Sequence, residues 1–180
     1  MALSVVGRSL TRNDAVDKVT GKAKYTADLA IPHMLHGKLL HSPYASAKII
    51  EIDVSEAKAL PGVRVVLTGQ DVPFTYGANL KDRPVFAQGI VRYHGEPVAG
   101  VVAETEAIAE EAVGLIKVKY EEMEPVLDPY KAMDKDSPIL HENLGSYYHS
   151  RISYPKPGTN ICSHYKLRKG DVEKEFANAD

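Results

Sequence analysis

The run Pro97-Val98-Ala99-Gly100-Val101-Val102-Ala103 is the strongest strand signal in the chain. It lacks polar alternation, which is typical of a strand covered on both faces. Thr105 follows as a helix cap, and residues 106–115 combine apolar residues on one side with glutamates in the early turns, where the helix dipole favours negative charge. Residues 116–120 then alternate apolar side chains with lysines and predict a strand with one wet face. This strand, helix, strand order sets the fold class.

Further strands are predicted upstream of this run. Residues 35–40 and 48–53 alternate in the manner of strands, and residues 63–67 are rich in β-branched side chains. The stretch from Gly69 to Ile90 contains Pro and Gly at several places, so we expect a loop with one or two helical turns.

A short helix is expected between the second and third of these strands. Asp53 is predicted to be its N-cap, with Glu56 reaching back three residues in a variant of the capping box. Pro61-Gly62 ends the helix within about two turns. The resulting order of strands and helices predicts an α+β domain with a mixed sheet and short helices packed on it.

The last quarter of the chain has a weaker pattern. We expect a first domain over residues 1–133, then an extended linker and the truncated start of another region over residues 134–180. Residues 161–167 are a possible strand, and Asp171 is placed to cap a helix that is cut off at Asp180. Because so short a helix needs tertiary partners, the natural polypeptide is expected to continue.

Composition excludes several classes of function. The 180 residues are 44% hydrophobic, enough for a core, and the net charge of −2 leaves no basic surface for nucleic acid. No apolar run approaches the ~20 residues that span a bilayer, and Met1 to Leu10 do not resemble a signal peptide. A cytoplasmic location is therefore the default expectation. Cys162 is the single cysteine, so an internal disulfide is excluded.

Three nearby histidines raise the question of a metal site. They are His33, His36 and His41. In an extended segment His36 and His41 point to opposite faces, and no acidic or thiolate partner stands at a useful spacing. Ordinary surface histidines are the favoured interpretation, and we expect no metal ligand here.

Two other groups invite a catalytic interpretation. His94 and Glu96 could act as an acid–base pair, but they sit at a Gly95 turn, where the favoured interpretation is a solvated hairpin with Glu96 or Tyr93 tying down the loop. Cys162 and His164 lack a separate orienting framework for a thiol nucleophile. We expect no catalytic residue in either group.

Phosphate-binding signals are equally weak. Neither Gly-x-Gly-x-x-Gly nor Gly-x-x-x-x-Gly-Lys-Ser/Thr occurs. The basic run Lys166 to Gly170 is followed at once by glutamates and is interpreted as a solvated face. We therefore expect no cofactor-binding residue in this chain.

A series of short blocks, in order and at fixed spacing, resembles the α/β hammerhead domain at the N-terminus of molybdenum hydroxylase large subunits, the xanthine dehydrogenase, aldehyde oxidase and aerobic carbon monoxide dehydrogenase family. The blocks are Gly7-Arg8-Ser9, Lys18 to Tyr25, Met34 to Pro43, Ile52 to Ser55, Pro61 to Val63, Gly95 to Ala99 and Tyr120 to Val126. The resemblance covers about Gly7 to Met133. Lys169 to Val172 resembles the lead-in to the molybdopterin-binding region that follows in that family.

The resemblance implies an oxidoreductase that hydroxylates carbon centres or oxidises carbon monoxide at a molybdenum-pterin centre. Electrons would leave through iron-sulfur clusters to FAD on partner subunits. In the family the catalytic and cofactor-contacting motifs follow the hammerhead, so no such role is assigned to any residue here. Certain positions are instead expected to define the fold: Tyr25, Asp28, Gly37, Pro43, Gly62, Gly95 and Pro97.

Three functions remain open from the sequence. The first is a structural N-terminal domain, catalytically incomplete alone, which packs on the molybdopterin-binding domains and exposes an apolar patch when isolated. The second is a free-standing binding or assembly module with the same fold, which would have a closed polar surface and an ordered tail. A small independent enzyme using His94 and Glu96 ranks last, because it requires a concave pocket around both residues.

Overall fold

The computed structural model describes residues 5–167 and 169–179. The chain divides into two compact units, Met1–Met34 and Leu35–Asp180. The first unit contains α1 (Ala15–Val19) and the 3₁₀ turn η1 (Thr26–Asp28). At η1 the Tyr25 N–H donates to the Asp28 carboxylate at 2.9 Å, and the Asp28 N–H donates to the Tyr25 carbonyl at the same distance. Both residues thus fix a turn, in agreement with the expectation that they define the fold.

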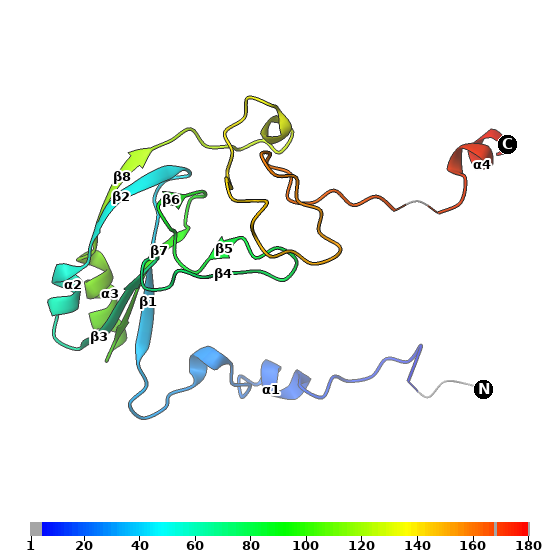
Figure 1. Ribbon diagram of the computed structural model, residues 1–180. Coiled ribbons are helices and arrows are strands. Elements are labelled where there is room, and N and C mark those ends of the chain that lie inside the picture. Colours follow the sequence, from blue (N-terminus) through cyan, green and yellow to red (C-terminus); the bar gives the residue numbers. More distant parts are fainter. Residues whose placement is uncertain (1–4, 168, 180) are drawn as a thin grey trace. The chain divides into compact units, whose positions relative to one another are not determined.

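The second unit holds the remaining elements (Figure 1). Its strands are β1 (His36–His41), β2 (Ala47–Asp53), β3 (Val63–Thr68), β4 (Thr75–Tyr76), β5 (Arg83–Pro84), β6 (Ile90–Val91), β7 (Pro97–Ala103) and β8 (Lys117–Glu122). Its helices are α2 (Ser55–Ala59), α3 (Glu106–Gly114), the 3₁₀ turn η2 (Lys131–Met133) and α4 (Val172–Ala177).

The strands form two three-stranded sheets and a two-stranded hairpin. The first sheet has the order β1-β7-β3, the second β6-β2-β8, and β4 pairs with β5. Every pairing among these strands is antiparallel. The α+β class predicted from the sequence is confirmed, but the expected mixed sheet is replaced by separate antiparallel sheets.

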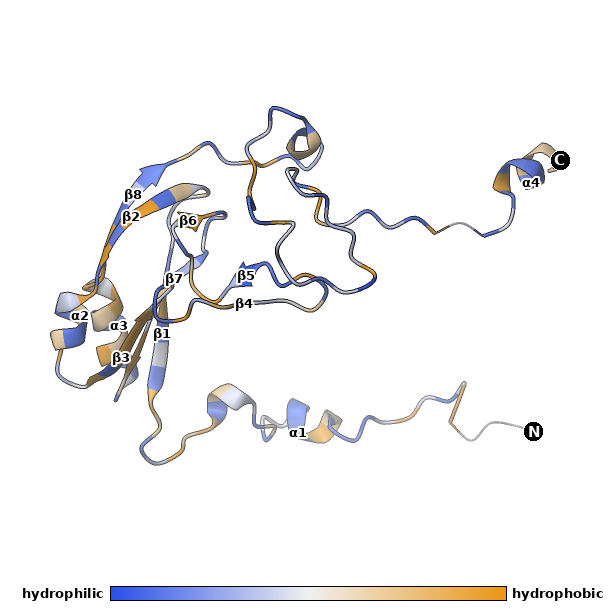
Figure 2. Cartoon of the chain, viewed as in Figure 1, coloured by the Kyte–Doolittle hydropathy of each residue, from blue (hydrophilic) through white to orange (hydrophobic). Residues whose placement is uncertain are grey.

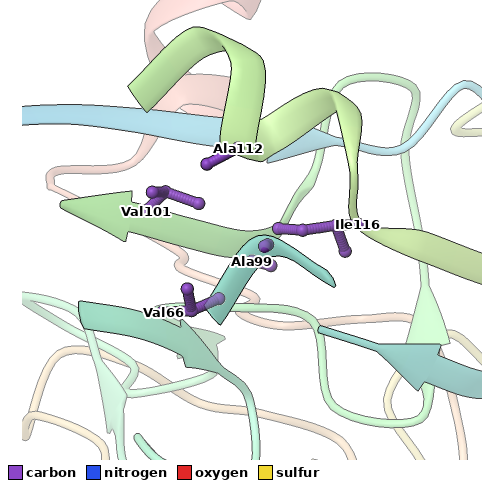
Figure 3. Packing of buried hydrophobic residues seen from close by; sticks show 6 residues of the cluster. Val66, Ala99, Val101, Ala112 and Ile116 are labelled. Atoms are coloured by element: carbon purple, nitrogen blue, oxygen red, sulfur yellow. The ribbon is translucent and has the colours of Figure 1, made fainter. Parts of the chain in front are cut away.

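One core lies between the first sheet and the helices α2 and α3. It contains Val66, Ala99, Val101, Ala112 and Ile116, which Figure 3 shows packed together. A second cluster lies around the other sheet and includes Val98, the neighbour of Ala99 on β7. Because Ile52 and Val118 pack against both clusters, the two cores are joined.

The strand β7 is buried on both faces, as its sequence predicted. One face meets the helices through Ala99 and Val101. On the other face, a Cβ added to Gly100 would lie 2.9 Å from the Phe86 ring, so the ring covers the strand there. Figure 2 shows the apolar character of β7 against the more hydrophilic β8.

The helix α3 confirms its predicted cap. The Thr105 side chain accepts a hydrogen bond from the Ile108 N–H at 3.2 Å. Residues Ala109 and Ala112 are buried against the sheet. At the far end of the chain, the Asp171 carboxylate likewise accepts from the Lys174 N–H at 3.1 Å and caps α4, as expected.

The start of α2 differs from the prediction. Its N-cap position is Val54, without a side-chain hydrogen bond. Asp53 instead accepts from the N–H and hydroxyl of Ser55, at 2.9 and 2.6 Å, and Glu56 forms an ion pair with Lys117. The capping-box prediction was wrong, because the Asp53 carboxylate is bound by Ser55 and the Glu56 carboxylate by Lys117. The predicted end of this helix before Pro61-Gly62 is confirmed.

Two predictions for irregular segments were wrong at least in part. Between residues 69 and 90 the structure has short strands that were not predicted and no assigned helix, although the Val72 N–H donates to the Thr68 carbonyl at 3.3 Å, as in a single helical turn. Residues 161–167 form no strand.

The segment expected to be an extended linker also differs in its first half. Residues 134–160 fold back onto the domain, and Leu144 is only 2% exposed. The extended tail is confined to the exposed residues that follow.

Candidate functional site

The loop between β6 and β7 is held by Glu96. Its carboxylate Oε2 accepts the Arg92 N–H at 2.5 Å, which closes the loop from inside. On the outside, the Gly95 N–H donates to the Ser42 carbonyl and the Ser42 N–H donates to the Glu96 carbonyl, both at 2.9 Å. Gly95 has a φ of +85°, a conformation that favours glycine. The expectation that Glu96 ties down this loop is confirmed, but the expected solvated hairpin is wrong at this residue, because Glu96 is buried.

Beside this loop lies a cavity of about 410 Å³, a volume within the range of small-molecule sites. It is lined by residues from the β4–β5 hairpin, the β6–β7 loop and the C-terminal segment: Tyr76, Asp82, Arg83, Pro84, Arg92, Tyr93, Glu96 and His141. Glu96 is the most buried ionisable group of this lining, with 4% of its surface exposed. Charges of both signs therefore border the cavity.

Burial shifts the titration of three lining residues. It raises the pKa of Glu96, against the opposing effect of the Arg92 N–H and guanidinium. It lowers the pKa of His141, and the positive charge of Arg92 acts in the same direction. The pKa of Tyr93 is raised, mainly by burial and then by the charge of Glu96. The cavity thus favours uncharged forms of all three side chains.

The two residues of the proposed acid–base pair are not brought together here. Glu96 lines the cavity, but His94 is exposed and is not part of the lining. The histidine beside the cavity is His141, forty-five positions after Glu96 in the sequence. Among the described residues, the cavity that Glu96 lines therefore does not bring His94 and Glu96 together, as the independent-enzyme hypothesis required.

The other candidate residues lie apart. His36 and His41 stand at the two ends of β1, and His33 belongs to the first unit, with a φ of +63°. Cys162 is exposed, and the adjoining basic run includes Arg168, which lies outside the described residues, as do Met1 to Ser4. Within residues 5–167 and 169–179, no three His, Cys, Asp or Glu side chains converge as metal ligands would.

Three residues of the site and its surroundings were missed by sequence reasoning. Arg92 donates from Nε to the Leu140 carbonyl at 2.7 Å, and His141 packs edge-on against Tyr147 with ring centroids 5.8 Å apart. Asn160 supports the same segment. The partners of these three residues lie far away in the sequence or in segments without periodicity. No local sequence pattern therefore predicts the three residues.

An apolar surface lies on the face of the first sheet opposite the helices. Leu39 and Val65 point to this face and are 48% and 43% exposed. Phe86 covers Gly100 between them. The sheet thus has one face packed by helices and one on which apolar side chains remain about half exposed.

Comparison with known proteins gives the same fold and a family. Residues 20–124 match the profile described as "Aldehyde oxidase and xanthine dehydrogenase, a/b hammerhead domain". The chain belongs to this family. The predicted resemblance is thereby confirmed, and the second unit contains the strands and helices of the hammerhead domain.

Curated relatives of the hammerhead domain are much longer than this chain. The nicotinate dehydrogenase large molybdopterin subunit of Eubacterium barkeri is 32% identical over 178 residues, which cover 98% of this chain and 38% of the relative. The xanthine dehydrogenase molybdenum-binding subunit of Escherichia coli O157:H7 is 31% identical over an alignment of 182 residues. This alignment covers 94% of this chain and 22% of the relative. The chain therefore corresponds to a part of such large chains.

Solved structures agree. The reconstituted CO dehydrogenase from Oligotropha carboxidovorans matches with a TM-score of 0.69 and 37% identity, over 76% of this chain and 18% of that one. Quinoline 2-oxidoreductase from Pseudomonas putida 86 matches with a TM-score of 0.64 and 40% identity, over 71% and 18%. The hammerhead domain is a structural part of these large chains and not the full enzyme.

Among the described residues of this hammerhead domain, no three His, Cys, Asp or Glu side chains form a group that could hold a metal ion, and no buried side-chain nitrogen or oxygen atom lacks a hydrogen-bond partner. No chemical step through the cofactor is assigned to these residues.

No described helix is both long and apolar enough to cross a membrane.

Proposed function

We propose that this chain is the scaffold domain of a molybdopterin-dependent oxidoreductase large subunit, and that the catalytic residues and cofactor ligands lie outside these 180 residues. The observation that carries this proposal is the match of almost the whole chain to about a fifth of a molybdenum-binding subunit. The molybdopterin-binding domains would be the direct partners. Iron-sulfur and FAD subunits as further partners and a cytoplasmic location belong to the same proposal.

The partly uncovered sheet face supports a packing role. Leu39 and Val65 place apolar area in solvent beside Phe86, which is costly for a domain that works alone. A second candidate is a free-standing binding or assembly module. It is supported by the back-folded segment 134–160, which buries Leu144, although the exposed apolar face does not favour it.

Complementation in trans tests the packing role. The xanthine dehydrogenase molybdenum-binding subunit of Escherichia coli O157:H7, lacking the segment that matches this chain, is co-expressed with the tagged 180-residue chain in a host that makes the pterin cofactor. We expect a stable complex that carries molybdenum after affinity and size-exclusion purification. The truncated relative alone is expected to carry much less.

Charge placed on the apolar face provides the discriminating variant. Leu39→Asp/Val65→Asp should abolish the complex, because burying an unpaired charge is strongly unfavourable. Lys119→Asp, at an exposed position of β8, is the control and should still assemble. Circular dichroism of each purified variant verifies folding. A folded wild-type chain that forms no complex would favour the free-standing module instead.

A further inference from the structure

Residues 132–160, which we call the strap, pass over the β4–β5 hairpin. Backbone hydrogen bonds join the two in both directions. The Lys81 N–H donates to the Tyr148 carbonyl at 2.9 Å, and the Ser150 N–H donates to the Asn79 carbonyl at 2.7 Å. The strap therefore belongs to the folded domain, although it lacks a regular element after η2.

The strap also meets the loop that Glu96 holds. Arg92 donates from Nε to the Leu140 carbonyl at 2.7 Å and from Nη1 to the Ile90 carbonyl at 3.3 Å. The next strap residue, His141, forms part of the wall of the Glu96 cavity. One side of the cavity is thus made by a segment that is distant in sequence from the other walls.

A single side chain fastens the strap to itself at its far end. The Asn160 Oδ1 accepts the Leu140 N–H at 2.8 Å, while Nδ2 donates to the Pro138 carbonyl at 2.9 Å and the Ala132 carbonyl at 3.1 Å. These partners require both the donor and the acceptor of an amide, in one orientation. Few other side chains could satisfy all three.

We infer that Asn160 is a latch that holds the strap closed and thereby keeps the strap as one wall of the Glu96 cavity. Leu140 links the two functions, since its N–H is bound by Asn160 and its carbonyl by Arg92. Releasing the latch frees the strap at the residue before His141. The inference rests on the proposed function in one respect only. If this chain is one domain of a large subunit, the strap determines the point at which the chain leaves the domain.

Asn160→Asp tests the latch in the 180-residue chain. The carboxylate cannot donate to Ala132 and Pro138 and places an acceptor against two carbonyls. We expect the amide hydrogens of Leu140, Lys81 and Ser150 to exchange at least about tenfold faster, as measured by NMR. Amides of β7 should keep their wild-type rates. Asn143→Ala, at an exposed asparagine of the same strap, is the matched control and should change none of these rates.

A second measurement addresses the cavity wall directly. Opening the strap admits water to Glu96, so the pKa of its carboxyl, raised by burial in the native chain, should fall toward its ordinary value in Asn160→Asp. The side-chain carboxyl resonance of Glu96 reports this titration. A pKa that stays as in the native chain would overturn the inference that the strap closes the cavity.

Exchange data separate a latch from a general stabiliser. Equal acceleration of strap and β7 amides would overturn the latch, since it indicates unfolding of the whole domain. Should Asn160→Asp fail to fold, Asn160→Ala removes all three hydrogen bonds without adding repulsion and must show the same local acceleration. These measurements involve neither molybdenum nor a partner, so their failure is distinguishable from failure of the proposed function.

Discussion

At the scale of single residues, Glu96 combines burial with a structural hydrogen bond. Its carboxylate accepts the Arg92 N–H in a place that water barely reaches. Burial disfavours the charged form more than this bond favours it, so the pKa is raised. The loop is therefore held by a group whose charge opposes folding.

This balance predicts a pH dependence. A carboxyl with a raised folded-state pKa contributes stability that is fully present below the ordinary value of 4.5 and is lost as pH rises through the folded-state pKa. Glu96→Gln stays neutral and can still accept from Arg92. Its free energy of unfolding, relative to wild type, should therefore increase with pH across this window. Urea denaturation at a series of pH values measures the difference, and Glu51→Gln is the exposed control. A difference that is constant with pH would contradict the account.

Two glycines predicted to define the fold differ in their surroundings. Gly62 has a φ of +89°, and a Cβ there would lie 2.7 Å from Ile108 Cδ1. Gly37 has an ordinary φ, and its nearest neighbour would be 3.9 Å away. The positive φ makes glycine necessary at position 62. At position 37 neither the φ nor the available space requires glycine.

Alanine substitution should separate these two positions. Gly62→Ala is expected to lower the free energy of unfolding by about 1–3 kcal/mol, because the left-handed conformation is strained and Ile108 must move. Gly37→Ala should change it by less than about 0.5 kcal/mol. Thermal and urea unfolding of both variants provide the test. Equal effects would show that the conformation at Gly62 is not the cause.

At the scale of elements, the sequence predicted correctly those helices and strands that are determined by interactions between neighbouring residues. The β7 run, the Thr105 cap and the alternation in β8 were all identified from neighbouring residues. The start of α2 was not, because Glu56 pairs with Lys117, sixty-one positions away. The strap was missed for the same reason, since Arg92 reaches Leu140 across forty-eight positions.

The cap of α3 gives a prediction at this scale. Thr105→Ala removes the acceptor for the Ile108 N–H and should cost about 1 kcal/mol of stability. Thr105→Ser retains the hydroxyl and should stay within a few tenths of a kcal/mol of wild type. Chemical denaturation compares the three proteins. An alanine variant as stable as the serine variant would mean that tertiary packing alone holds the helix.

At the scale of the whole chain, the described residues form two joined hydrophobic cores and no metal site. Both sheets have continuous cores, yet the first sheet leaves an apolar face with Leu39 and Val65 in solvent. The charged and polar groups around Glu96 converge on a cavity but include no set of metal ligands among the described residues. The open apolar face supports our proposal of a scaffold domain that packs on other domains of the large subunit.

The sequence could indicate the role of a scaffold domain only through its resemblance to a known family. Periodicity predicted the strands and helices, but no spacing rule predicts that a sheet face will remain open. The ordered blocks from Gly7 to Val126 carried the family assignment, which the comparisons confirmed. The cavity residues Arg92 and His141 come together only through tertiary contacts. Neither periodicity nor family resemblance therefore predicted them as neighbours.

The most direct test of the central claim is the molybdenum content of the purified 180-residue chain after expression in a host that makes the pterin cofactor. Elemental analysis should be paired with circular dichroism, so that only folded protein is counted. The account predicts a folded chain with no more molybdenum than a mock purification. Near-stoichiometric molybdenum in the folded chain would contradict it, and would place cofactor ligands among residues to which none is assigned.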